Sequence, residues 1–291
     1  MLSPPVDVLA LTGVGLRLRG QTLLDDVGFT LRYGERLIVL GASGAGKSLL
    51  LDAIAGNIPH TGTAVFSDAV SAGRRTFSYD SFATLGLLKV DEVLRFLEAT
   101  YRAARNDRMV ARLRLETILA KPVRVLSKGE RKRLGVYCAL FSDPTVAILD
   151  EPTDGMDPEL RDAFWTLVKE RRGATMLTTH LWEEAERFHD RIALMANGRL
   201  LSPPAPVGAL CALHPYGGKV IVAPRFADRI DRRALLVDDR LHVFWTDDAD
   251  KKAILGALGP DGIAAGYSIL PLDLGDTYRL LVDDQQKVPH P

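Results

Sequence analysis

The sequence predicts an α/β protein with a wound, largely parallel sheet in its first two thirds and a smaller α/β module after it. Leu37–Leu40, Val146–Leu149 and Ala174–Thr178 are short apolar runs, as expected of strands buried on both faces. Helical patterns alternate with them, which favours a wound sheet. The proline cluster at Ser202–Pro206 marks a boundary. We therefore expect domains at residues 1–202 and 203–282, and a disordered tail at 283–291.

The composition excludes several classes of protein. Apolar residues make up 47% of the 291 positions, and Lys+Arg and Asp+Glu both number 37. Because these charges balance, the chain has no net positive charge to attract nucleic acid, and we expect no nucleic-acid partner. Cys138 and Cys211 lie far apart in the sequence. We expect both to be reduced and to serve as small apolar residues in a cytosolic protein. No run of 18 apolar residues and no secretion signal is present, so we expect any membrane part to belong to another chain.

The elements of the first region follow from their periodicity. Leu9–Leu18 and Gly28–Leu31 alternate as short strands do. Lys47–Asn57 carries apolar residues at helical spacing and ends near a glycine. Val90–Leu119 is also helical in pattern, and we expect it to form an insertion into the sheet-based core.

The second region has strand patterns with a turn at Asp238–Arg240. We expect a helix over Asp248–Leu258. The predicted strands are Lys219–Ala223, Ala234–Val237, Leu241–Thr246, Ile263–Leu270 and Thr277–Val282.

A glycine-rich loop between the Leu37–Leu40 strand and the next helix fits the pattern G-x-x-x-x-G-K-[ST]. Its glycines let backbone N–H groups close around a phosphate, and the helix N-terminus adds a favourable dipole. Lys47 is expected to reach the β- and γ-phosphates, and the Ser48 hydroxyl to bind Mg²⁺. The nucleotide-binding candidates here are Gly41, Ser43, Gly44, Ala45, Gly46, Lys47, Ser48 and Leu49. The alternative is a plain glycine-rich turn.

Two carboxylates follow the Val146–Leu149 strand. Asp150 is costly at the end of a buried strand unless it meets a cation or hydrogen-bond donors. After a phosphate loop, that cation is expected to be Mg²⁺, held jointly with Ser48. Glu151 is placed to activate an attacking water. The alternative for Asp150 is a capping carboxylate.

The tetrapeptide Ser127–Glu130 precedes a helix predicted over Arg131–Leu140. Serine is a good N-cap, and glutamate favours a first turn, so capping alone could explain it. Its position suggests more, because it lies 80 residues after Lys47 and 23 before Asp150.

From Leu9 to Leu201 the chain resembles the nucleotide-binding subunits of ATP-binding cassette (ABC) transporters, most specifically from Leu126 onward. The motifs that carry the resemblance are the phosphate loop, LSKGE, ILDEPTDGMD and the histidine after ATMLTT. It implies a P-loop ATPase core of ABC type with an antiparallel β subdomain and a helical subdomain at about 81–135. ATP and Mg²⁺ are the implied cofactors.

The segment LSKGE is similar to the family's LSGGQ signature. The resemblance implies that Ser127 and the Gly129 amide cap the γ-phosphate of ATP bound by a second subunit. Lys128 replaces the first glycine of the signature and Glu130 its glutamine.

Other site residues are also carried over from the family. Asp157 matches the aspartate of the D-loop at the subunit interface, and His180 matches the switch histidine that contacts the γ-phosphate. Asp80 falls where the family has its switch glutamine, and it is a candidate magnesium ligand or an exposed turn residue. No aromatic residue is found where the family stacks adenine, so Leu18 or Arg19 would have to serve.

The single cassette, without long coiled coils or zinc-binding cysteine pairs, indicates a transporter subunit rather than a repair or translation protein. The region of LSKGE and the end of the tail resemble the bacterial drug, bacteriocin and polysaccharide exporter class. The implied partners are a second nucleotide-binding subunit, expected to be an identical chain, and multi-span permease subunits at the cytoplasmic face of the membrane. A soluble ATPase regulator and an importer subunit are the alternatives.

Overall fold

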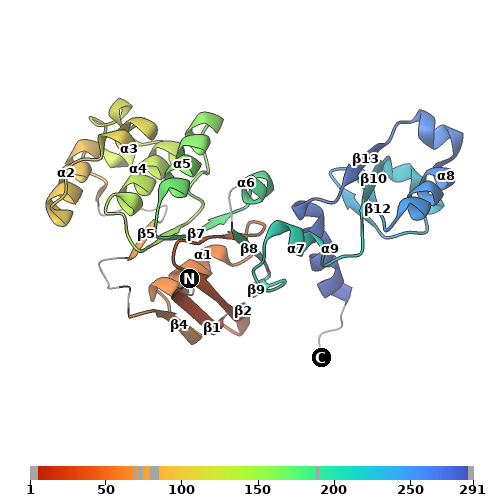
Figure 1. Cartoon of the computed structure of the whole chain (residues 1–291), viewed down its shortest axis with the longest axis horizontal. Coiled ribbons are helices and arrows are strands. Elements are labelled where there is room, and N and C mark those ends of the chain that lie inside the picture. Colours follow the sequence, from red (N-terminus) through yellow and green to blue (C-terminus); the bar gives the residue numbers. More distant parts are fainter. Residues whose placement is uncertain (1–5, 69, 71–74, 79–84, 188–189, 288–291) are drawn as a thin grey trace, which may run out of the picture. The chain divides into compact units, whose positions relative to one another are not determined.

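The computed structural model describes residues 6–68, 70, 75–78, 85–187 and 190–287. The chain divides into two compact units, Met1–Ala205 and Pro206–Pro291. Within the described ranges, no helix combines the length and the apolar character that a membrane crossing requires. The first unit contains the sheet predicted around the glycine-rich loop (Figure 1).

The main sheet of the first unit has six strands in the order β5-β6-β7-β3-β8-β9. All neighbouring pairs are parallel except β8 and β9. Every residue of β6 and β7 is buried, which explains their unbroken apolar patterns. The strands are β3 (Arg36–Leu40), β5 (Arg75–Ser78), β6 (Val146–Leu149), β7 (Ala174–Thr179), β8 (Arg191–Ala196) and β9 (Arg199–Leu200).

A second, antiparallel sheet of order β2-β1-β4 packs on the same core. Its strands are β1 (Asp7–Leu18), β2 (Gln21–Arg32) and β4 (Thr61–Phe66). The two long strands are bulged and extend beyond the predicted segments. Their buried residues Val14 and Leu31 join Leu37 and Leu50 in one cluster. The expected α/β fold with an antiparallel subdomain is therefore confirmed.

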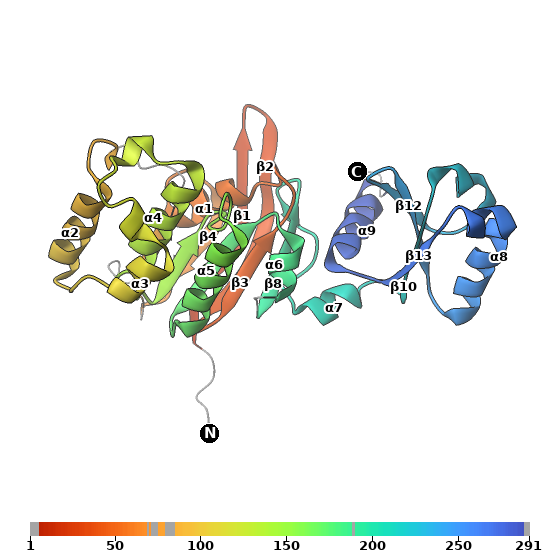
Figure 2. The same cartoon turned by 90° about the horizontal axis from the view of Figure 1, so that it is seen from above.

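Three helices of the first unit form one group. α2, α3 and α4 lie together at one end of the unit in both views (Figure 1, Figure 2). The helical region expected over Val90–Leu119 is broken, because Arg102 takes a left-handed conformation after α2 and Asn106 caps α3. The helices are α1 (Lys47–Ala55), α2 (Val90–Tyr101), α3 (Asp107–Arg112), α4 (Lys128–Leu140), α5 (Pro158–Glu170) and α6 (Trp182–Arg187), with short 3₁₀ turns at Leu115–Thr117 and Val123–Val125.

The second unit is a four-stranded antiparallel sheet with helices, of order β11-β12-β10-β13. Val220 and Val243 pack against Ile254 and Leu258 of α8 in a core separate from that of the first unit. The elements are α7 (Val207–Cys211), β10 (Gly218–Val222), a 3₁₀ helix (Pro224–Arg229), β11 (Ala234–Val237), β12 (Arg240–Trp245), α8 (Asp248–Ala264), β13 (Ser268–Pro271) and α9 (Leu274–Lys287).

The end of the second unit differs from the prediction. The strand expected over Thr277–Val282 is wrong, because these residues form the middle of α9. Asp273 and Asp276 accept hydrogen bonds from each other's backbone N–H groups, a reciprocal cap that starts the helix. The strand expected over Ile263–Leu270 is shorter, because α8 runs to Ala264. Residues 283–287 of the expected disordered tail belong to α9, and 288–291 lie outside the described residues.

Candidate functional site

The glycine-rich loop joins β3 to α1 and has a backbone that requires glycine at several points. Gly44 and Gly46 have φ angles of 82° and 101°, in the left-handed region that other residues rarely adopt. A Cβ atom on Gly41 would lie 2.2 Å from the Met195 carbonyl oxygen of β8. The loop is therefore held close to the sheet, with the N-terminus of α1 open beyond it.

Lys47 is the first residue of α1 and is 5% exposed. Its ammonium group donates hydrogen bonds to the Gly41 carbonyl at 2.8 Å and the Ala42 carbonyl at 3.1 Å. It also lies 3.4 Å from Glu151 Oε1. The cation is thus fixed at the mouth of the loop, where an anion entering the loop would meet it.

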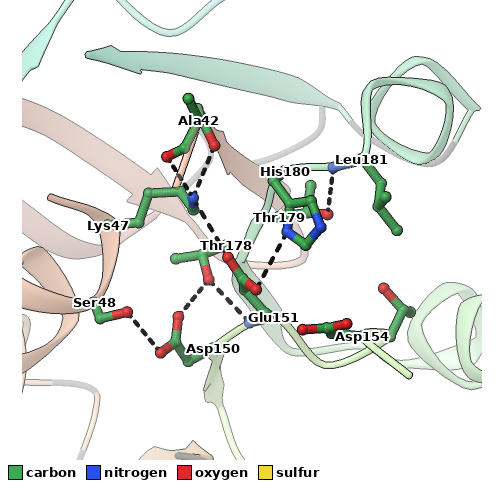
Figure 3. Close-up of polar contacts among 12 residues, drawn as sticks. Ala42, Lys47, Ser48, Asp150, Glu151, Asp154, Thr178, Thr179, His180 and Leu181 are labelled. Atoms are coloured by element: carbon green, nitrogen blue, oxygen red, sulfur yellow. Dashed lines mark hydrogen bonds and ion pairs between the residues drawn. The ribbon is translucent and has the colours of Figure 1, made fainter. Parts of the chain in front are cut away.

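Asp150 joins the phosphate loop to the sheet (Figure 3). Ser48 Oγ donates to its Oδ2 at 2.9 Å, and Thr178 Oγ1 donates to its Oδ1 at 2.5 Å. Its backbone N–H donates to the Ser78 carbonyl of β5. The carboxylate is therefore oriented from both sides and points toward the hydroxyl of the loop.

Glu151 adopts a left-handed backbone with φ of 43°, which costs a non-glycine residue about 1–3 kcal/mol. Its N–H donates to Thr178 Oγ1 at 2.9 Å, and this bond helps to hold the turn. Its carboxylate lies between Lys47 and His180, whose Nδ1 is 3.2 Å from Oε2 (Figure 3). A residue with a strained backbone, whose carboxylate lies between an ammonium group and an imidazole, is typical of a functional site.

A pocket of about 210 Å³ lies over this group of residues. Its lining residues are Ser43, Gly44, Gly46, Lys47, Ser48, Leu49 and Glu151. Ala45 is buried beneath the loop, where its carbonyl accepts from the Gly198 N–H. The structure thus brings together the loop, Asp150, Glu151 and His180, as the sequence predicted that they would be.

Ser127, Gly129 and Asp157 are not among the residues that line this pocket. Ser127 caps α4 by accepting from the Glu130 N–H at 3.3 Å, and Asp157 caps α5 by accepting from the Leu160 N–H at 2.9 Å. Asp80 lies outside the described residues.

Gly129, in the first turn of α4, lies directly on the loop that follows Glu151. A Cβ atom there would be 2.3 Å from the Gly155 carbonyl oxygen. The first turn of α4 and residues 155–156 are thus in backbone contact, which only a glycine at 129 permits.

The two departures from the signature both have structural partners. Lys128 Nζ lies 2.5 Å from Asp154 Oδ2. Glu130 accepts from the Ser127 N–H at 2.8 Å, which completes a capping box, and pairs with Lys121 at 2.8 Å. The hydrogen bond and charge of Lys121, together with Ser127, lower the pKa of Glu130 below its ordinary value against the effect of burial.

Sequence reasoning missed two residues that support the site. Thr178 holds both Asp150 and the backbone of Glu151, and it is fully buried. Lys132 is 5% exposed and donates to the Asp150 carbonyl at 2.6 Å. A buried hydroxyl in an apolar strand was a signal for Thr178, whereas Lys132 reads as one of several basic residues on a helix.

A phosphate-type loop ahead of a helix, facing two carboxylates that follow a strand of the same sheet, defines a P-loop nucleotide hydrolase. Comparisons with known proteins give the family. Residues 24–154 match the family model described as ABC transporter. The chain is 32% identical to the Bacillus subtilis ABC transporter ATP-binding protein YhcH, a match covering 67% of this chain and 68% of that protein. It is 34% identical to the Nod factor export ATP-binding protein I of Ralstonia nicotianae, covering 68% and 67% of the two chains.

A solved ATP-binding subunit of an ABC transporter has the same fold, with a TM-score of 0.63 over 71% of this chain and 92% of that one, at 23% identity. The chain belongs to the ATP-binding subunits of ABC transporters. It is an ATPase whose hydrolysis of ATP drives transport, and subunits of this family act with membrane permease partners.

Proposed function

We propose that this chain is the ATPase of an exporter, working as a pair of identical chains on a separate permease at the cytoplasmic face of the membrane. Two relatives support export. The Nod factor export ATP-binding proteins I of Ralstonia nicotianae and Neorhizobium galegae are 34% and 32% identical to it. The second match covers 79% of this chain, so it is longer than the first unit and reaches into the second. The similarity to an export protein therefore includes part of the second unit.

The binding step uses groups already in place. The phosphates of ATP enter the loop at the N-terminus of α1, and the γ-phosphate replaces Glu151 and two carbonyls as partners of Lys47. Removing Lys47 from Glu151 frees that carboxylate. Substrate binding itself therefore releases the general base.

The donor set beside the loop fits Mg²⁺, which prefers oxygen ligands. The Ser48 hydroxyl and the Asp150 carboxylate are hydrogen-bonded at 2.9 Å, so both oxygens can face one ion. When bound, Mg²⁺ neutralises charge on the β- and γ-phosphates. Thr178 and Lys132 hold Asp150 in position for this role.

Glu151 accepts the proton of the attacking water, and His180 contacts the γ-phosphate. The observation that carries this assignment is the strained Glu151 between Lys47 and His180. The strained backbone fixes the carboxylate where the water must lie, so little reorganisation is needed during hydrolysis.

Ser127 and Gly129 cap the γ-phosphate bound by the partner chain, with Asp157 at the interface. Support comes from their absence from the lining of the chain's own phosphate pocket and from their place at the N-terminus of α4, where the helix dipole favours an anion. ATP binding then also closes the pair. The permease is received near Asp80 and the helices of residues 90–119, and the division into an ATPase domain and an accessory domain remains a prediction.

The first test changes the general base. Glu151→Gln keeps the shape of the side chain but removes its basicity, so hydrolysis should slow by about 100-fold or more. The variant should accumulate as an ATP-bound dimer, measured by size-exclusion chromatography with light scattering. Glu183→Gln, at an exposed carboxylate on α6, is the matched control. Normal turnover in Glu151→Gln would contradict the assignment.

The second test concerns capping by the partner. Ser127→Arg should bind ATP with unchanged affinity on its own loop, because that loop is intact, but it should not dimerise. Calorimetry and light scattering measure the two properties separately. A variant as dimeric as the parent chain in ATP would exclude capping in trans.

A further inference from the structure

The chain departs from its family where Lys128 stands in the signature, and the structure gives this lysine a partner. Lys128 is the first residue of α4, and its ammonium group lies 2.5 Å from Asp154 Oδ2. The side chain of Lys128 is 57% exposed and that of Asp154 is 26% exposed. The pair therefore joins the signature to the loop that follows Glu151, within one chain.

Lys128 lowers the pKa of Asp154. Burial raises the pKa of Asp154, but the hydrogen bond and charge of Lys128 outweigh it, with His180 and Lys132 adding to the effect. The pKa lies below its ordinary value, and the carboxylate is ionised at neutral pH. The pair is thus a true ion pair rather than a hydrogen bond between neutral groups.

Two further contacts connect the same surfaces. The backbone at Gly129 lies against Gly155, and Lys132, one turn along α4 from Lys128, donates to the Asp150 carbonyl at 2.6 Å. The first turns of α4 therefore lie along the segment from Asp150 to Gly155. Of these contacts, only the Lys128–Asp154 pair depends on two side chains.

The same loop is continuous with the general base. The Asp154 N–H donates to the Glu151 carbonyl at 3.2 Å, which closes a tight turn between them. Thr153 donates to Glu184 of α6 at 2.7 Å, so the loop is also tied to the helix that follows His180. A shift of Asp154 cannot leave the Glu151 turn undisturbed.

We propose that Lys128 is a positioning residue that ties the signature to the Glu151 turn, so that capping the partner's ATP aligns the general base on the chain's own ATP. The inference rests on the proposed dimer. A lysine provides this link through Asp154, where the family's glycine leaves only backbone contact. The two sites of a dimer should therefore hydrolyse ATP cooperatively.

The test compares the parent chain with Lys128→Ala and Asp154→Asn. Both variants should keep ATP affinity on the loop, because the loop residues are unchanged. The Hill coefficient for hydrolysis should fall from about 2 toward about 1, and kcat by about five-fold. Lys252→Ala, at an exposed lysine of the second unit, is the matched control. Thermal unfolding should be unchanged, because exposed pairs contribute little to stability.

The decisive variant is the charge-swapped chain, Lys128→Asp with Asp154→Lys. If Lys128 acts by pairing with Asp154, the swapped pair restores cooperativity. If Lys128 instead contacts the partner's phosphate, an aspartate there would repel it and the swap would be worse than either single change, which would overturn the proposal. Unchanged kcat and Hill coefficient in Lys128→Ala would also overturn it. A parent chain that does not dimerise in ATP would refute the proposed function, and this inference with it, whereas the other outcomes concern Lys128 alone.

Discussion

Lys47 in the first unit and Lys219 in the second are both buried, and their charges are satisfied in opposite ways. Lys47 is 5% exposed and meets two carbonyl groups and a carboxylate 3.4 Å away. Lys219 in β10 is 3% exposed and lies 2.7 Å from Asp273 and 2.6 Å from Asp276. The first cation has weak partners that a phosphate can replace. The second is already neutralised, which is typical of a structural ion pair.

The charges around Lys219 make the contrast clearer. Burial lowers the pKa of Lys219, but Asp273 and Asp276 outweigh it, so the pKa lies above its ordinary value. Burial raises the pKa of Asp273, but Lys219 outweighs it and the pKa lies below its ordinary value. His242 of β12 lies 3.5 Å from Asp276, and burial followed by the charge of Lys219 lowers its pKa. This cluster fixes α9 to the sheet and leaves no cation for a ligand.

The largest expected effect separates the two lysines by function. Lys47→Ala should weaken ATP binding by at least about 100-fold, because about 3 kcal/mol is lost when a buried charged hydrogen bond to an anion is removed. Calorimetry measures the affinity. Hydrogen exchange in β3 and β7 should stay slow, because the partners of Lys47 are loop carbonyls. Destabilised strands would mean that Lys47 is structural like Lys219.

The reverse result is expected for the second lysine. Lys219→Met should destabilise the second unit by about 3 kcal/mol, because Asp276, which is fully buried, would lose its cation. Exchange of amides in β10 and α9 should accelerate, while ATP affinity stays unchanged. Lys252→Met, at an exposed lysine of the same unit, is the control. An equal effect of the two changes would remove the distinction between the units.

Acid should also destabilise the second unit, with a smaller effect. His242 has a folded-state pKa below 6.5, so the unfolded state binds the proton first as the pH falls from there, and stability is lost. Asp273 adds a further loss below about pH 4, again because its folded-state pKa is depressed. Between pH 7.5 and pH 5 the melting temperature of the unit should therefore fall, as measured by calorimetry at a series of pH values.

At alkaline pH the dependence is reversed, and the stability of the second unit should fall as the pH rises. Lys219 has a raised pKa, so its contribution is complete below its ordinary value and is lost as the pH rises through the folded-state value. His242→Gln should flatten the acid limb above pH 5 and leave the alkaline limb in place. A profile unchanged by this substitution would mean that another group titrates.

Short sequence patterns correctly predicted those parts of the molecule that are formed by consecutive residues. The loop from Gly41 to Gly46 leads directly into α1 at Lys47 and Ser48, and the φ angles of Gly44 and Gly46 require glycine there. Asp150 and Glu151 were found because they directly follow a buried strand. Thr178 and Lys132 were missed because they reach Asp150 from 28 and 18 positions away, through packing that no sequence pattern records.

The errors in the second unit also have a physical origin. Thr277–Val282 contains the β-branched and aromatic residues typical of strands, yet the reciprocal cap of Asp273 and Asp276 and the ion pairs with Lys219 place it in α9. Propensity here was outweighed by contacts with β10, more than 50 positions earlier. A helix-start signal of two aspartates three residues apart was present and was given too little weight.

The backbone contact between Gly129 and Gly155 has a genetic consequence. Any side chain at position 129 would displace the loop of its own chain, and in the proposed pair it would also spoil the cap that this chain offers its neighbour. If equal amounts of parent and Gly129→Ala chains pair at random, roughly a quarter of the pairs keep two good caps. Such an allele would therefore be dominant, reducing transport in a cell that still makes the normal protein.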